Sequence, residues 1–122
     1  MKLDHTIVPC LDNTVSAAFY ADILNFREGG SHFSFEVVHV DDTLKLLFSN
    51  RKKVRSNHYA FRASAMEYDT VLNRLITRSL PYGDSPADRN NQSEYLREDD
   101  KGFYFDDPDG HILEVITERT QR

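Results

Sequence analysis

Apolar residues recur every three or four positions in two parts of the chain. This spacing runs from Val15 to Phe26 and returns from Tyr68 to Ile76. It places apolar side chains on one face of a helix. Good capping residues, 12–14, precede the first segment, and the second follows Ser64-Ala65-Met66-Glu67, a Ser-x-x-Glu capping box. The pattern therefore predicts two helices.

Short β-rich runs flank each predicted helix. Asp41-Asp42 joins two of them as a hairpin, and Asp107-Pro108-Asp109-Gly110 is a strong turn signal between two others. Gly29-Gly30 is interpreted as a break, and the polar residues 83–93 as a long loop. The predicted strands cover residues 3–9, 33–40, 43–49, 58–63, 94–97, 102–106 and 111–117.

The order strand, helix, strands occurs twice, which indicates an internal repeat. His5 aligns with His58 at an offset of 53, and Leu46 aligns with Glu114 at an offset of 68. One half alone cannot cover both faces of its sheet, whereas two halves can. The predicted fold class is α+β, with two paired βαβββ modules, residues 1–50 and 56–122, joined by a basic linker 51–55. We expect one domain, a curved mixed-sheet cup with the helices outside.

Composition narrows the function classes. The 122 residues carry 15 basic and 20 acidic side chains, a net charge of −5, which disfavours nucleic acid as a partner. No apolar run is long enough to cross a membrane. Asp4 and His5 interrupt the segment where a signal peptide needs an apolar core, and Cys10 is the only cysteine. We expect a cytoplasmic protein whose partner is a small molecule.

Three residues suggest metal chemistry. His5 and His58 occupy the same position in the two repeats, and Glu114 interrupts the otherwise apolar run from Ile112 to Ile116. A carboxylate in such a strand is costly to bury unless something pairs with it. Two histidines and one glutamate that converge within a sheet can hold a divalent metal and leave positions open for a substrate.

The C-terminal segment Tyr104-Phe105-Asp106-Asp107-Pro108-Asp109-Gly110-His111, followed by Leu113-Glu114, resembles the signature of the vicinal oxygen chelate superfamily. The segments Leu3-Asp4-His5-Thr6 and Asn57-His58-Tyr59 also match its repeat pattern. That superfamily includes glyoxalase I, extradiol dioxygenases, fosfomycin-resistance thiol transferases and bleomycin-resistance proteins. The resemblance implies a glyoxalase-like cup, a homodimer, and metal ligands at His5, His58 and Glu114. It does not specify a reaction.

Within the superfamily the residues favour a dioxygenase-like enzyme with a two-His-one-Glu site. The resemblance to glyoxalase I would imply a fourth protein ligand on the closing strand of the first repeat. The offset of 68 places that position at Leu46, whose side chain cannot bind a metal. Fe(II) is the favoured ion for such a triad, with Mn, Zn or Ni as alternatives. Two alternative functions remain. The first is a lyase or thiol transferase of the same superfamily. The second is a metal-free binding protein similar to bleomycin-resistance proteins, whose acidic character this chain shares.

Two further residues are candidates for catalysis. Tyr104, ten residues before Glu114, can donate a hydrogen bond to a bound oxyanion. Glu36, taken as the repeat equivalent of Tyr104, is expected to face the cup as a general base or an acidic wall, and His39 to face away from it. His111 follows a turn and is interpreted as structural, because strand alternation separates it from Glu114.

Overall fold

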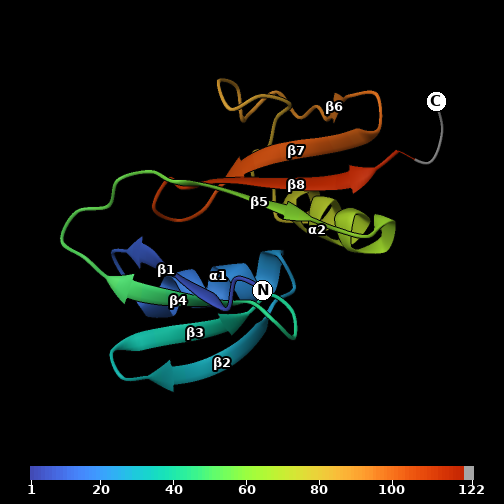
Figure 1. The fold of residues 1–122 in the computed structure, drawn as a ribbon. Helices are drawn as coiled ribbons and strands as arrows, with labels where there is room; N and C mark the ends of the chain where they lie inside the picture. The colour runs from blue at the N-terminus through green and yellow to red at the C-terminus, as the bar shows by residue number, and fades with distance from the viewer. Residues whose placement is uncertain (120–122) are drawn as a thin grey trace. The chain divides into compact units, whose positions relative to one another are not determined.

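The computed structural model describes residues 1–119 of the chain (Figure 1). These residues form two helices and eight strands. The first half contains β1 (His5–Cys10), α1 (Asn13–Ile23), β2 (Arg27–His32), β3 (Phe35–His39) and β4 (Lys45–Asn50). The second half contains β5 (His58–Arg62), α2 (Ala65–Thr77), β6 (Tyr95–Leu96), β7 (Asp100–Asp106) and β8 (Ile112–Glu118). No helix within residues 1–119 is long and apolar enough to span a membrane.

The chain divides into two compact units, one covering Met1–Arg55 and one beginning at Ser56. Each unit is a βαβββ module with its own four-stranded mixed sheet, ordered β1-β4-β3-β2 in the first and β5-β8-β7-β6 in the second. In both sheets the opening strand pairs in parallel with the closing strand, and the other pairs are antiparallel. The α+β class and its paired βαβββ modules are confirmed (Figure 1).

Helix α1 begins where the sequence predicts, but it buries a different face. The Asp12 side chain accepts hydrogen bonds from the first free backbone N–H groups, which fixes the start of the helix. Its buried residues are Ser16, Ala17, Tyr20 and Ile23, whereas Val15 is exposed. Residues 15–20 are apolar at nearly every position, so the spacing of apolar residues alone could not identify the buried face. The Tyr20 ring packs on Phe48 of β4, with 4.7 Å between ring centroids.

Strand β2 passes through the two glycines that the sequence analysis interprets as a break. Its six residues are all exposed, and its pairing with β3 shifts between Glu28 and Gly30, which marks a bulge. An exposed edge strand needs no apolar alternation, so the hydrophobic pattern carried no signal for it.

Helix α2 confirms its capping box. The Ser64 hydroxyl accepts from the Glu67 backbone N–H, and the Glu67 side chain accepts from the Ser64 backbone N–H. Tyr68 is fully buried, and its ring meets Phe103 of β7 edge-on at 4.9 Å between centroids. The Tyr68 hydroxyl donates to Glu94 at 2.6 Å. The helix thus covers the face of the second sheet that carries Phe103.

The strand register shifts the repeat alignment by one residue. Ile7 pairs with Leu47 in the first sheet, and its equivalent Ala60 pairs with Glu114 in the second. The repeat equivalent of Glu114 is therefore Leu47, at an offset of 67, and not Leu46. Both residues are leucine, so the conclusion that the first module offers no fourth metal ligand at this position is unchanged.

The same one-residue shift reverses the orientation expected for Glu36 and His39. Glu36 pairs with Phe48, the residue that packs on α1, so Glu36 lies on the helix-facing side of the sheet, where it accepts a hydrogen bond from Ser31. His39 pairs with Lys45 and shares the opposite face. The prediction that Glu36 faces a cup with the helices outside it is wrong, because a slip of one residue moves a side chain to the other face of a strand.

Candidate functional site

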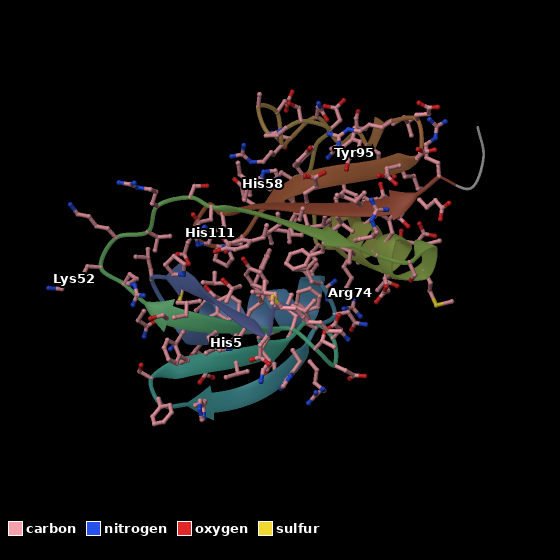
Figure 2. The ribbon with its side chains drawn as sticks, in the orientation of Figure 1. His5, Lys52, His58, Arg74, Tyr95 and His111 are labelled. Carbon is pink, nitrogen blue, oxygen red and sulfur yellow. The ribbon has the colours of Figure 1, made fainter. Side chains whose placement is uncertain are left out.

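The second unit brings together two of the three predicted metal ligands. His58 lies at the start of β5 and Glu114 in the middle of β8, two neighbouring parallel strands. His58 Nε2 and Glu114 Oε1 are 2.9 Å apart. The Glu114 side chain is buried, whereas His58 is 44% exposed. A buried carboxylate therefore supports an imidazole that an incoming ligand can reach. Figure 2 labels His58 on this unit.

The second oxygen of Glu114 is held by a residue that the sequence analysis missed. The Tyr95 hydroxyl donates to Glu114 Oε2 at 2.6 Å. Tyr95 pairs with Gly102, so its ring must lie across β7 to reach β8. A Cβ atom at Gly102 would stand 2.3 Å from the Tyr95 hydroxyl oxygen and 2.3 Å from Cζ. Gly102 therefore leaves the space through which Tyr95 reaches Glu114.

Tyr104 lies beside this pair, as its register requires. It pairs directly with Glu114 across β7 and β8, and its ring lies 5.8 Å from that of His58. Arg97 donates to the Tyr104 hydroxyl at 3.3 Å, and its guanidinium carbon lies 4.2 Å from the centre of the Tyr95 ring. The face of the second sheet opposite α2 thus gathers the side chains of His58, Tyr95, Arg97, Tyr104 and Glu114.

Both tyrosines are held in the protonated form. Burial raises the pKa of Tyr95 well above its ordinary value, and the hydrogen bond to Glu114 and the charge of that carboxylate add to the effect. Burial also raises the pKa of Tyr104, followed by the charge of Glu114, while Arg97 opposes the shift. Both hydroxyl groups therefore stay protonated at neutral pH, and that of Tyr95 donates its proton to Glu114.

His5, the third predicted ligand, lies at the start of β1 in the first unit. Its Nδ1 contacts Asp4 Oδ2 at 2.7 Å, and this hydrogen bond, followed by the charge of Lys45, lowers the pKa of Asp4. A second nitrogen, Nε2, is left for another partner. His5 lines a cavity of about 550 Å³ in this unit. The other lining residues are Asp4, Gly29, Ser31, His32, Phe33, Phe35, Val37, Lys45 and Leu47.

The donor atoms of the second unit fit a divalent metal in kind. Within residues 1–119 no three His, Cys, Asp or Glu side chains gather at metal-binding distances, so the pair His58 and Glu114 is the starting point. An imidazole nitrogen and a carboxylate oxygen are both ligands that divalent transition metals take in proteins.

His111 has the structural environment that the sequence analysis expects. It is fully buried just before β8, and its Nδ1 accepts from the Asn57 backbone N–H at 2.9 Å. Its own backbone N–H donates to Asp107 in the preceding turn, and its ring meets Tyr59 edge-on at 5.5 Å. These contacts fix the turn that begins β8 and so the register of Glu114.

Sequence reasoning missed Tyr95, Arg97 and Gly102. The two-residue strand β6 offers too short a pattern to show which of its side chains face Glu114. The available signal was indirect: Gly102 is a glycine inside a seven-residue strand, where the absence of a side chain often marks the close approach of another group.

Comparison with solved structures places this fold among known proteins. The chain is 32% identical to oxidase ChaP-H2, with a TM-score of 0.90 over 98% of this chain and 94% of that one. It is 35% identical to oxidase ChaP-H1, with a TM-score of 0.90 over 100% and 99%. The fosfomycin resistance protein FosX from Listeria monocytogenes shares the fold at 19% identity, with a TM-score of 0.75 over 98% and 95%.

No family model and no curated protein sequence match the chain. The assignment therefore rests on the two oxidase structures, whose identity to this chain exceeds 30% over nearly its whole length, and on the paired βαβββ modules. On these grounds the chain belongs to the vicinal oxygen chelate superfamily, which comprises the glyoxalases, bleomycin-resistance proteins and dioxygenases.

Proposed function

We propose that this protein is a divalent-metal-dependent oxidase that acts on a small molecule with neighbouring oxygen atoms. The observation that carries the proposal is the buried Glu114 carboxylate, held between His58 and Tyr95 on an accessible sheet face. The similarity to oxidases ChaP-H1 and ChaP-H2 supports oxidative chemistry over other reactions of the superfamily. Dioxygen is the electron acceptor that such an oxidase requires.

His58 and Glu114 are the residues that would hold the metal in the second unit, and His5 stays the predicted third ligand. Fe(II) is the favoured ion, with Mn, Zn or Ni as alternatives, because two imidazoles and one carboxylate are typical of non-haem iron sites. A metal bound there supplies adjacent open positions at which dioxygen and an oxygen-chelating substrate can meet.

The neighbouring residues determine which oxygen of Glu114 is available to a metal ion. Because Tyr95 occupies Oε2, only Oε1 points toward His58, and the carboxylate is offered through a single oxygen. Residues that orient a metal ligand in this way strongly affect metal affinity. The protonated Tyr104 hydroxyl can donate to an oxyanion of the substrate.

The first module favours a three-ligand site over the four-ligand arrangement of a glyoxalase. Leu47 occupies the position equivalent to Glu114, and its pair Val37 occupies the position equivalent to Tyr104. Neither side chain can bind a metal. This difference supports an oxidase and weighs against a lyase.

Metal analysis of protein purified without a histidine tag tests the proposal. Wild type should hold about one divalent ion per chain. Glu114→Gln keeps the shape of the side chain but removes its charge, and should lose most of the metal. Glu118→Gln, an exposed glutamate on the same strand, is the matched control and should keep it. His111→Ala should also keep the metal, because that ring contacts Asn57 and Tyr59.

One observation favours a metal-free binding protein as the second candidate. Both Glu114 oxygens have protein partners within hydrogen-bonding distance, His58 and Tyr95. If wild type holds no metal as purified and takes up none from added Fe(II), Mn, Zn or Ni, the oxidase proposal fails and this candidate replaces it.

We also propose that the protein is a homodimer, as the superfamily resemblance implies. Sedimentation velocity at micromolar concentration should show a species of twice the 14.1 kDa chain mass. A monomer at this concentration would contradict the proposal.

A further inference from the structure

Phe33 lies at the tip of the hairpin between β2 and β3 and combines two unfavourable features. Its φ is +54°, in the left-handed region that bulky side chains rarely adopt. Its side chain is also 89% exposed, although it is fully apolar. Glycine or asparagine is the usual residue at such a hairpin position, because neither is penalised there. A phenylalanine at this position is therefore penalised by its backbone conformation and gains little from burial.

The surroundings of Phe33 indicate what its ring can contact. Phe33 and the neighbouring His32 both line the cavity of the first unit, and their rings meet edge-on at 4.5 Å between centroids. Phe35, Val37 and Leu47 supply further apolar walls. At about 550 Å³ the cavity has the size of a small-molecule site.

The strand register places His5 and Lys45 at one end of this cavity and the rings of His32, Phe33 and Phe35 at the other. His39 pairs with Lys45 and so marks the level of the first end on β3. Phe35, which pairs with His32 next to Phe33, lies four residues away from His39 along β3. Four residues of a strand span about 13 Å. An occupant that touches both ends must therefore be several rings long, or a ring with a chain.

We propose that Phe33 is a specificity-determining residue of this cavity, where its ring stacks on an uncharged, flat ring at the end of the ligand remote from His5. The proposal deepens the proposed function, on which it rests: it takes this cavity, which the predicted ligand His5 lines, as the place where part of that substrate binds. An aromatic side chain on a rigid two-residue turn offers a large contact area with little conformational entropy to lose.

The test uses N-phenyl-1-naphthylamine, an uncharged aromatic probe that becomes fluorescent in apolar sites, with the full-length protein in the presence of EDTA. Because no metal takes part, failure of the metal proposal and failure of this one are distinguishable. Wild type should bind one probe per chain. Phe33→Gly should weaken the affinity about 5-fold or more, which corresponds to the loss of one aromatic pair. Phe33→Tyr, which keeps the ring, should stay within about 2-fold of wild type.

Thermal stability separates ligand contact from a role in folding. Phe33→Gly should leave Tm unchanged or raise it, because glycine accepts a positive φ. Ser79→Gly is the matched control: Ser79 also has φ +54° and is exposed, but it lies at the end of α2 in the other unit. It should not lower Tm and should leave probe affinity unchanged.

Three results would overturn the proposal. The first is a wild type that does not bind the probe saturably, and the second is a Phe33→Gly variant with wild-type affinity. The third is a Phe33→Gly variant with a lower Tm or an altered sedimentation coefficient, which would assign Phe33 to packing or to self-association.

Discussion

Gly102→Ala should break the hydrogen bond between Tyr95 and Glu114 although neither of these two residues is substituted. The new Cβ would stand 2.3 Å from the Tyr95 hydroxyl oxygen, whereas ordinary contacts begin at 3.4 Å. The hydroxyl must therefore retreat by about 1 Å, the difference between these two distances. Its hydrogen bond to Glu114 is now 2.6 Å long and would be stretched beyond hydrogen-bonding range.

The expected cost follows from the two effects of this substitution. Loss of a hydrogen bond to a charged group costs about 1.5–3 kcal/mol. Alanine in place of glycine in a strand returns about 0.5–1 kcal/mol, because the unfolded chain has less conformational entropy. The net destabilisation is about 0.5–2.5 kcal/mol, which for a chain of this size lowers Tm by about 2–12 °C.

Thermal unfolding followed by circular dichroism measures this loss, and a double-mutant cycle assigns it. In a Tyr95→Ala background the ring and its hydroxyl are both gone, so Gly102→Ala should cost little more. Absorbance at 295 nm should also show the pKa of Tyr95 returning toward its ordinary value in the Gly102→Ala protein. Full additivity of the two substitutions, or an unchanged Tyr95 titration, would refute the interpretation that Gly102 makes room for Tyr95.

Three other outcomes are expected. The raised pKa values of Tyr68 and Tyr95 stabilise the folded chain below the ordinary tyrosine pKa of about 10, and this contribution is lost as pH rises above it. Urea unfolding should therefore give a smaller free energy of unfolding at pH 11 than at pH 9, and the difference should shrink in Tyr68→Phe. Ser64→Ala removes the cap of α2 and should lower the free energy of unfolding by about 1 kcal/mol in the same assay. Its metal content should equal that of wild type. Phe103→Ala leaves a cavity at a fully buried position between Tyr68 and Tyr82. It should lower the free energy of unfolding by about 3–5 kcal/mol, as measured by calorimetry.

The fold could be predicted from the sequence because the signals for its helices, turns and repeat were local and occurred twice. The capping box at Ser64, the turn before His111 and the doubled strand-helix-strand order each have a direct physical cause, and the structure contains all three. The edge strand β2 had no such signal, because none of its side chains is buried.

Only part of the candidate site could be predicted from the sequence. His58 and Glu114 were found because a carboxylate in an apolar strand calls for a partner, and the structure supplies it at 2.9 Å. The orientation of Glu36 was wrong because strand alternation turns an error of one residue into the opposite face of the sheet. Tyr95 was missed because its role depends on the bare backbone of Gly102 on another strand, a relation that no spacing within one segment encodes.

The most direct test of the metal site is anomalous diffraction from crystals of the protein loaded with Fe(II) under anaerobic conditions. The account predicts one ion bound by His58 Nε2 and by the Oε1 atom of Glu114, with Oε2 still accepting from Tyr95 and with His5 as the third protein ligand. An ion bound through both Glu114 oxygens, an ion elsewhere on the chain, or no ion beside His58 would contradict it.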